Sequence, residues 1–177
     1  MKVLAFAASN SSKSINRALV THASSVIQSE VFPGAEVELL DINDYEMPLF
    51  SSDREERDGI PALAYAFRER VASADALVIS FAEHNGSVTA AFKNLFDWVS
   101  RIDKAVYQGR PVVMLATSPG GRGGKGVLEF VTSVAPFFGA DLRSSLSVPN
   151  FGSVFEGDEL VDPDLAAALR DALLSLR

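Results

Sequence analysis

Short apolar runs alternate with amphipathic helical patterns along the whole chain, and this alternation constrains the fold more than any other feature of the sequence. The first run, KVLAFAA (2–8), is almost continuously apolar, which is typical of a strand covered on both faces of a sheet. Apolar residues then recur at helical spacing over 15–27, and strand and helix patterns keep alternating from there on. We therefore predict an α/β fold in which right-handed crossovers join the strands of a parallel sheet.

These patterns predict five strands and five helices. The strands are expected at 2–8, 36–42, 75–82, 110–118 and 140–148. The helical patterns cover about 15–27, 61–72, 92–99, 127–134 and 165–176, the last with Asp162 as its N-cap and Pro163 in its first turn. Residues 43–59 are expected to form a loop, and 149–161 an irregular stretch. Periodicity leaves the strand orders 2-1-3-4-5 and 3-2-1-4-5 open, but in both a ligand binds beyond the carboxyl ends of the strands, where the order reverses.

The size and composition of the chain indicate a single domain over 1–177, without a membrane segment. A chain of 177 residues, 47% of them hydrophobic, fills one core of ordinary size. No apolar segment approaches the roughly 18 residues that span a bilayer, and the apolar start is too short for a signal peptide. The absence of cysteine excludes disulfides, thiolate metal sites and thiol catalysis, and it favours a reducing cytoplasm.

The charge and the histidine content narrow the classes of ligand and of chemistry. A formal net charge of −7 argues against a nucleic-acid partner because phosphate backbones are repelled at long range, although local geometry can still bind a small anion. Only His22 and His84 are present, and His22 falls inside a predicted helix, so no metal site is expected. Neither histidine has an evident acidic partner and no G-x-S-x-G motif occurs, which leaves nucleophilic catalysis without support.

The loop after the first strand, SNSSKSIN (9–16), has the composition of an anion site. It leads directly into a helix, whose first main-chain N–H groups lack partners within the helix and attract an anion. Its side chains add donors and one positive charge: Ser9, Ser11, Ser12, Ser14, Asn16 and Lys13. This composition can hold a phosphate dianion, but a serine-rich turn with Ser14 as an ordinary N-cap explains it equally well.

The loop after the third strand, EHNGS (83–87), carries an acid, a histidine, an amide and a glycine between a strand and a helix. Gly86 allows the main chain to approach a ligand closely. The loop can therefore present main-chain amides to a ligand. A plain strand-to-helix turn with a solvated His84 is an equally weighted alternative.

The loop after the fourth strand, SPGGRGGKG (118–126), is rich in glycine. Its last six residues satisfy G-x-G-x-x-G, but they follow the fourth strand instead of the first, and no acid follows at the expected distance. A Walker A loop is excluded because Pro119 stands in place of its first glycine and Gly126 in place of its Ser or Thr. We expect a flexible wall of main chain against which a planar ring can lie, with Arg122 placed to meet a second anionic molecule.

Together these motifs resemble those of the NAD(P)H-dependent FMN reductase family, which includes azo-, quinone- and chromate-reducing members. The matching segments are AASNSSKSINRAL (7–19), DINDYEMPLF (41–50), AEHNGSVTAAFKNLFDW (82–98) and SPGGRGG (118–124), and they cover most of residues 1–126. The resemblance implies a flavodoxin-like three-layer sandwich, with a five-stranded parallel sheet in order 2-1-3-4-5 and FMN bound at the first and third strands.

The resemblance also implies roles for individual residues, carried over by position. The phosphate loop corresponds to Ser9, Ser14, Ile15 and Asn16, with Ser11 and Lys13 between them. The main-chain amides that hydrogen-bond the polar edge of the isoalloxazine ring correspond to Ala82, Glu83, His84, Asn85 and Gly86. The loop beside the ring corresponds to Ser118, Gly120, Gly121 and Gly123, with Arg122 among them.

The chain departs from the family pattern within these loops. The family usually has glycine at Ala8, arginine at Ser11, tyrosine at His84, and proline at Ala82 and Thr89. With the arginine absent, the lysine of the same loop remains as a substitute cation, with the geometry of a point charge. FMN stays the expected cofactor, while the choice between NADH and NADPH is open.

The helix after the third strand is expected to pack between subunits. It carries an apolar girdle wider than one core face requires: Phe92, Leu95, Phe96, Trp98 and Val99. In the family this helix lies between subunits and the segment NDYEMPLF (43–50) can cover a neighbour's flavin, so the resemblance implies a homodimer or a dimer of dimers. Lys93 and Asp97, one turn apart, form either a surface ion pair or an intersubunit contact.

The function implied is that of an FMN-dependent oxidoreductase working by ping-pong exchange, first with NAD(P)H and then with a quinone, an azo compound or free flavin. Hydride transfer through a flavin leaves the chemistry to the cofactor, which agrees with the missing acid–base machinery. Three alternatives remain. The flavin can be a dissociable substrate for a partner monooxygenase, the chain can be a flavodoxin-type electron carrier, or it can be a degenerate fold member that binds a regulatory ligand.

Overall fold

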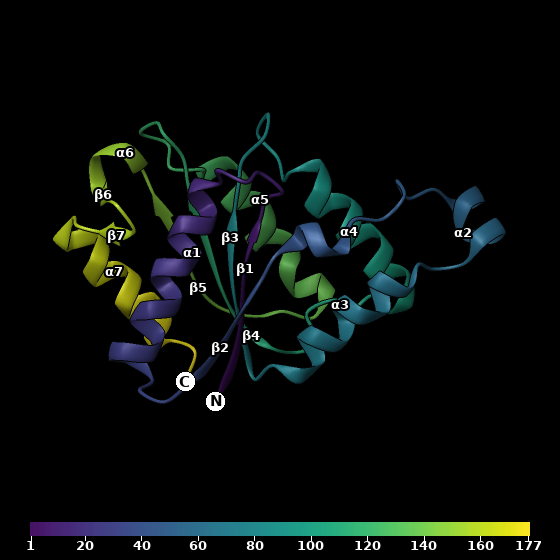
Figure 1. Ribbon diagram of the computed structural model, residues 1–177, viewed down its shortest axis with the longest axis horizontal. Coiled ribbons are helices and arrows are strands. Elements are labelled where there is room, and N and C mark those ends of the chain that lie inside the picture. Colours follow the sequence, from purple (N-terminus) through teal and green to yellow (C-terminus); the bar gives the residue numbers. More distant parts are fainter.

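The computed structural model describes all 177 residues and contains the predicted five-stranded parallel sheet. Its strands are β1 (Lys2–Ala8), β2 (Glu36–Leu40), β3 (Ala76–Phe81), β4 (Pro111–Thr117) and β5 (Asp141–Val148). They are ordered β2-β1-β3-β4-β5, and every neighbouring pair is parallel. This decides between the two orders that periodicity left open, and the sheet is flavodoxin-like, as the resemblance implied (Figure 1).

The central strands β1, β3 and β4 are buried on both faces, which explains their nearly continuous apolar sequences. Every residue of β3 is buried, and in β1 and β4 only the first residue is partly exposed. The edge strands β2 and β5 include exposed residues. Continuous apolar runs therefore mark the middle of this sheet, as expected for parallel strands covered by helices.

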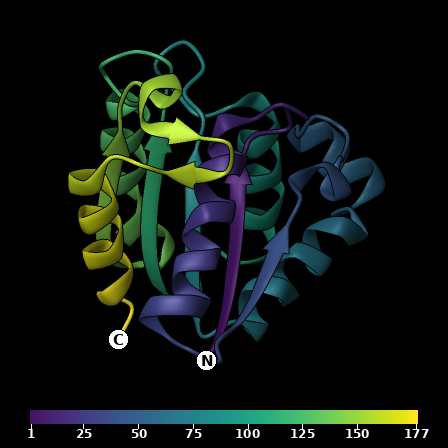
Figure 2. The same ribbon diagram turned by 60° about the vertical axis from the view of Figure 1, so that its left-hand side comes forward.

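Helices cover both faces of the sheet (Figures 1 and 2). The principal ones are α1 (Ile15–Val26), α3 (Ala62–Ser73), α4 (Ala90–Ile102), α5 (Lys125–Val134) and α7 (Pro163–Leu174). A π-helical turn at Ile27–Val31 extends α1, and a 3-10 turn at Ala135–Phe138 extends α5. One buried cluster joins α1 and α7 to the sheet, and the other joins α3, α4 and α5 to the opposite face. No helix combines the length and the apolar character that crossing a bilayer requires.

The start of α7 confirms the predicted N-cap. Oδ1 of Asp162 accepts the main-chain N–H groups of Asp164 and Leu165 at 3.1 and 2.9 Å. The leucine stripe of this helix faces the core, where Leu169 and Leu173 are fully buried. Sequence signals at both the cap and the apolar face therefore agreed, and this helix was predictable.

Residues 43–59 contain more regular structure than predicted. A 3-10 turn covers Ile42–Tyr45, and the helix α2 covers Ser52–Asp58. Ser51 caps α2, because its hydroxyl accepts the N–H of Arg54 at 3.2 Å. The helix has no buried residue and stands away from the sheet (Figure 1), so it lacks the apolar periodicity by which a helix is recognised in a sequence.

The stretch before α7 is also more regular than predicted. It forms the short helix α6 (Phe151–Val154) and an antiparallel pair of two-residue strands, β6 (Phe155–Glu156) and β7 (Glu159–Leu160). None of these elements is long enough to show a periodic pattern.

Two side chains of α4 hold the segment that precedes α2. Oδ1 of Asn94 accepts the N–H of Phe50 at 2.8 Å, and its Nδ2 donates to the carbonyl oxygen of Met47 at 3.0 Å. Nε1 of Trp98 donates to the carbonyl oxygen of Pro48 at 2.7 Å. The chain between β2 and α2 is thereby fixed against α4.

Candidate functional site

The three loops selected from the sequence meet in one cavity at the carboxyl ends of β1, β3 and β4. Its volume is about 230 Å³. It is lined by Ser9, Ser11, Lys13, Ser14, Ile15, Asn16, Ala82, Glu83, His84, Thr117, Ser118 and Pro119. The other predicted residues lie outside this lining, further along the same loops: Asn85, Gly86, Gly120, Gly121, Arg122 and Gly123. Because the strand order reverses between β1 and β3, the cavity lies where an open parallel sheet binds its ligand.

The start of α1 presents main-chain amides to this cavity. Ser14 is the N-cap of α1, and its hydroxyl accepts the N–H of Arg17 at 3.3 Å. The main-chain N–H groups of Ile15 and Asn16 have no acceptor within the chain. Ser14 is therefore an ordinary N-cap, and the helix start also offers free donors of the kind that bind an anion. The N-cap explanation is confirmed, and the anion site stays a prediction.

The serine hydroxyls of the first loop are oriented by the main chain. Oγ of Ser9 accepts the N–H of Ser11, and Oγ of Ser11 accepts the N–H of Lys13, each at 3.3 Å. A hydroxyl that accepts in this way still has its own proton to donate. The loop therefore holds several O–H donors, already positioned, beside the free amides of α1.

The charges around the first loop are unevenly paired. Arg17 forms an ion pair with Asp41, at the end of β2. The pKa of Asp41 lies below its usual value because its carboxylate accepts the N–H of Asn43 and bonds to the guanidinium of Arg17. Lys13 lines the cavity and makes no ion pair with the rest of the chain, so it supplies the free positive charge of the lining.

Asn16 has a different role from the one expected of its side chain. The residue is 2% exposed. Its Oδ1 accepts from Oγ of Ser80 at 2.8 Å and from the N–H of Thr117 at 3.0 Å, and its Nδ2 donates to the carbonyl oxygen of Thr117 at 3.2 Å. The side chain expected to donate to an anion thus bonds α1 to β3 and β4, while its main-chain N–H faces no partner. A serine inside an otherwise apolar strand was the available signal for this network.

The loop after β3 is a two-residue hairpin turn. The N–H of His84 donates to the carbonyl oxygen of Ser87 at 2.9 Å, and the N–H of Ser87 donates back at 3.1 Å. Asn85 and Gly86 between them have φ angles of 52° and 76°. Asn-Gly is the residue pair that this type I′ geometry favours. The main-chain N–H groups of Glu83, Asn85 and Gly86 have no acceptor within the chain, so the turn exposes donors.

Thr89, where the family usually has proline, links two elements of the site. It is the N-cap of α4, and its Oγ1 accepts the N–H of Phe92 at 3.2 Å. The same hydroxyl donates to the carbonyl oxygen of Ala8, the last residue of β1, at 3.1 Å. A buried threonine therefore replaces the proline with a hydrogen-bonded connection between the end of β1 and α4.

The glycine-rich loop is anchored, which corrects the expectation of a flexible wall. The N–H groups of Asn150 and Phe151 donate to the carbonyl oxygens of Gly120 and Ser118, both at 3.1 Å. Gly123 has a φ of 58°, and a Cβ there would lie 2.4 Å from the side-chain Oγ of Ser147 in β5. The loop is held by residues that follow β5, which a sequence motif confined to 118–126 could not reveal.

The lining contains little that could transfer protons. Its ionisable side chains are Lys13, Glu83 and His84. The carboxylate of Glu83 accepts a main-chain N–H from α5, and no histidine–carboxylate pair of the kind used in general acid–base catalysis is formed. The lining instead offers neutral hydrogen-bond donors and one lysine.

Comparisons with known proteins agree with this description. Residues 1–151 match the family described as NADPH-dependent FMN reductase. A probable NADPH:quinone oxidoreductase 2 of Oryza sativa subsp. japonica is 29% identical over 182 residues, which cover 100% of this chain and 87% of the relative. An NAD(P)H-dependent FMN reductase of Pseudomonas aeruginosa is 34% identical over 120 residues, 68% of this chain and 61% of the relative. The solved structure of FerB, a flavoenzyme NAD(P)H:(acceptor) oxidoreductase from Paracoccus denitrificans, has a similar fold, with a TM-score of 0.78 at 21% identity. The superposed region covers 99% of this chain and 96% of that chain.

The fold defines a flavodoxin-like protein, with the cavity at the carboxyl ends of β1, β3 and β4. The chain belongs to the NADPH-dependent FMN reductase family. It is an oxidoreductase whose cofactor is FMN, and the resemblance inferred from the loop motifs is confirmed.

Proposed function

We propose that the chain holds FMN in the 230 Å³ cavity and transfers electrons from NAD(P)H to a small acceptor such as a quinone, an azo compound or free flavin. Bound there, FMN would supply the hydride and electron chemistry, and the donor and the acceptor would use the site in turn. The observation that carries this proposal is the convergence of three donor-rich loops on one cavity at the switch point of the sheet.

Residues 9–16 form what we call the anion end of the cavity. Its free amides, at Ile15 and Asn16, would bind the phosphate of FMN together with the serine hydroxyls of the loop. Lys13 would supply the positive charge that the family places at Ser11. Neutral donors and a helix N-terminus can hold a dianion in this way even in a chain with a net charge of −7.

Residues 82–86 and 118–124 form what we call the ring end. The free N–H groups of Glu83, Asn85 and Gly86 would meet the polar edge of the isoalloxazine ring, and the anchored glycine-rich loop would lie beside it. Arg122 is exposed and makes no ion pair, so it would meet an anionic part of the pyridine nucleotide. The chain's own contribution to the reaction is then positioning of the reactants and exclusion of water, not proton transfer.

A visible absorption spectrum tests the proposal directly. We expect purified protein supplied with FMN to show a bound-flavin spectrum that bleaches under anaerobic NADH or NADPH and recovers when a quinone is added. The double-reciprocal lines of rate against donor concentration should be parallel at different quinone concentrations, as ping-pong exchange requires. Protein that neither retains nor titrates FMN would contradict the proposal.

One observation favours a second candidate, in which the flavin is a dissociable substrate. Ser11 stands where the family usually has arginine, so the phosphate would lack a bidentate partner. Gel filtration of the FMN-loaded protein separates the two functions: a cofactor elutes with the protein, whereas a substrate is lost.

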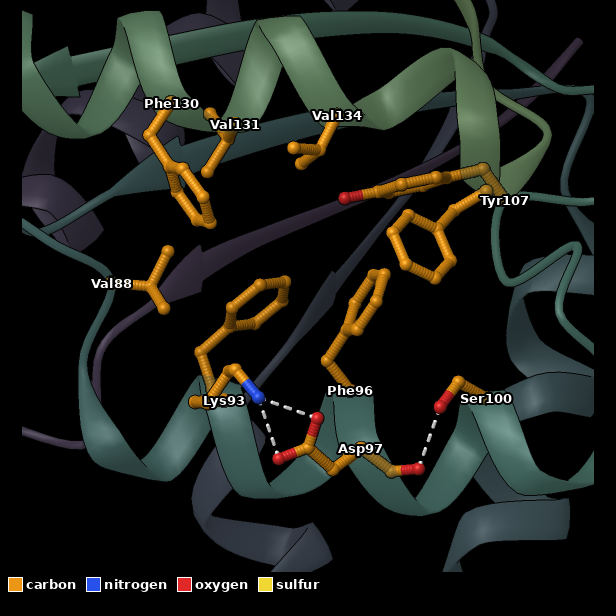
Figure 3. Close-up of a pocket in the computed structure, with 11 residues that line it drawn as sticks. Val88, Lys93, Phe96, Asp97, Ser100, Tyr107, Phe130, Val131 and Val134 are labelled. Atoms are coloured by element: carbon orange, nitrogen blue, oxygen red, sulfur yellow. Dashed lines mark hydrogen bonds and ion pairs between the residues drawn. The ribbon is translucent and has the colours of Figure 1, made fainter.

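We also propose that the chain forms a homodimer through α4 and α5. A groove of about 170 Å³, lined mainly by apolar side chains, runs between these helices (Figure 3). Phe130, which lines the groove, is 44% exposed, and Phe137, in the 3-10 turn after α5, is 71% exposed. Apolar surface of this kind is covered when a second copy packs on it, and the same groove on both copies suits a twofold interface.

Lys93 and Asp97 lie at the edge of this groove (Figure 3). Nζ of Lys93 lies 2.6 and 2.8 Å from the two carboxylate oxygens of Asp97, so the surface ion pair within α4 is present. The intersubunit contact stays a prediction.

Light scattering coupled to size-exclusion chromatography tests the interface. We expect a dimer, or a dimer of dimers, for the wild type and a monomer for Phe130→Glu. Val161→Glu is the matched control because Val161 is 43% exposed outside α4 and α5. A monomeric wild type, or a Phe130→Glu protein of unchanged mass, would contradict this interface.

The cytoplasmic location expected from the cysteine-free sequence also stays a prediction.

A further inference from the structure

The side chain of Glu83 leaves the ring end and reaches the start of α5. Its Oε2 accepts the main-chain N–H of Val127 at 3.2 Å. A Cβ built on Gly126 would lie 3.1 Å from its Oε1. The carboxylate therefore sits directly against the first turn of α5, across 44 residues of sequence.

This contact takes the place of a local helix cap. The N-cap of α5 is Gly124, which has no side chain to accept an N–H from the first turn. The N–H of Val127 would otherwise have no acceptor, and a carboxylate at a helix N-terminus is also favoured by the helix dipole. Glu83 supplies from another loop what a Ser or Asp supplies in most helices.

The two partners of this contact belong to the two parts of the ring end. The main chain of Glu83 lies within 82–86, where several amides have no acceptor within the chain, and α5 begins directly after 118–124. One carboxylate thus connects the turn after β3 to the glycine-rich loop after β4. The gap of 3.1 Å is tight, so a side chain at position 126 would require the carboxylate of Glu83 to shift.

We propose that Glu83 is a positioning residue that holds 82–86 at a set distance from 118–124, and that residue 126 is glycine to admit its carboxylate. This rests on the proposed binding of FMN in the cavity. The link preorganises both sides of the slot for the planar ring, so its loss weakens the ring's contacts while the anion end stays intact.

Flavin titrations of the apoprotein separate the ring end from the anion end, because riboflavin shares the ring of FMN but lacks its phosphate. We expect Glu83→Ala to raise the dissociation constants of FMN and riboflavin by the same factor, about tenfold, comparable to the loss of a helix cap. Glu83→Gln should remain within about threefold of wild type, since an amide oxygen can still accept the N–H of Val127. Glu129→Gln is the matched control because Glu129 is an exposed carboxylate of α5 without a side-chain partner.

Gly126→Ala tests the same link without removing the carboxylate. Alanine favours a helix over glycine by an amount comparable to a helix cap, which offsets the weakened cap from Glu83, so this variant should melt close to wild type. It should nevertheless weaken both flavins, by about fivefold, because its Cβ displaces Glu83. In the Glu83→Ala background the same substitution should have no further effect on affinity, since a double-mutant cycle reports whether two residues act through one contact.

Two outcomes would overturn the inference. One is a Glu83→Ala protein with a lower melting temperature but unchanged affinity for both flavins, which would make Glu83 only a helix cap. The other is a loss of affinity for FMN but not for riboflavin, which would move its effect to the anion end. Wild-type protein that binds neither flavin would overturn the proposed function as well, so the two failures are distinguishable.

Discussion

The anion end and the ring end of the cavity are held by contacts of very different range. At the anion end the hydroxyls of Ser9, Ser11 and Ser14 accept N–H groups two or three residues further along the chain. At the ring end, Oγ of Ser147 donates to the carbonyl oxygen of Gly123 across 24 residues, and Glu83 reaches α5 across 44. A local motif can therefore specify most of the anion end, where only the side chain of Asn16 makes long-range bonds, whereas the shape of the ring end depends on the packing of β5 and α5.

The largest effect is expected from Gly123→Ala, which disrupts the long-range contacts of the ring end by a steric clash. The new Cβ would lie 2.4 Å from Oγ of Ser147 and 2.8 Å from the main-chain N of Pro149, at a φ of 58° that alanine rarely adopts. We expect the free energy of unfolding to fall by about 3 kcal/mol, measured by urea denaturation.

Gly120→Ala is the matched control in the same loop, because a Cβ there meets nothing within 4 Å and its φ is not positive. Its effect should stay below about 0.5 kcal/mol. Equal stability of the two variants would show that the loop can detach from the residues after β5, and the comparison between the two ends would fail.

Asn16→Ala is expected to have the next largest effect. This buried side chain is the one long-range contact of the anion end, and its removal leaves groups of Ser80 and Thr117 without partners. We expect a loss of about 2 kcal/mol in the free energy of unfolding. Asn10→Ala, at an exposed position of the same loop, should be nearly neutral. A neutral Asn16→Ala would mean that the anion end is local throughout.

Lys13→Ala should act on binding and not on stability. Removing the free charge of the anion end should weaken FMN binding about fivefold at low salt and less at high salt, since an exposed charge is screened. Riboflavin, which has no phosphate, should bind as before, and flavin fluorescence titration measures both. Lys104→Ala, an exposed lysine on another surface, is the control. An equal loss for riboflavin would place Lys13 at the ring end.

The smallest effect is expected from Asp41→Asn, on the free energy of unfolding at acid pH. The pKa of Asp41 is lowered in the folded chain, first by the N–H of Asn43 and also by Arg17. An acid of this kind contributes stability above its usual pKa of 3.8 and loses it as the pH falls through the lower folded value. Asp41→Asn should therefore flatten the fall in unfolding free energy below about pH 4, measured by urea denaturation at a series of pH values. An unchanged pH profile would show that the contact does not stabilise the fold.

Much of the fold could be predicted because its main elements carry periodic apolar residues. The strands lie within two residues of their predicted bounds, and the cap at Asp162 was recognised from its residue type. The helices α2 and α6 were missed, because α2 has no buried residue and α6 is four residues long. A pattern method needs a buried face and several turns, and these helices have neither.

The candidate site could be located from the sequence but not described. The serines, the Asn-Gly turn and the glycine-rich loop were visible as composition at the ends of strands. The bonds of Asn16 to Ser80 and Thr117, the anchoring of the glycine-rich loop and the reach of Glu83 were not. Each of these joins residues far apart in the sequence, and no spacing rule connects them.

By itself the sequence determined the α/β class, the positions of the strands and the donor-rich character of three loops. Apolar periodicity, turn residues and helix caps are local properties, because they depend only on residues close together in the sequence. The strand order and the meeting of the three loops were expectations that the tertiary structure confirmed, and only that structure showed the anchoring of the ring end. Those follow from the pairing and packing of distant segments, whose energies depend on contacts that a linear pattern does not contain.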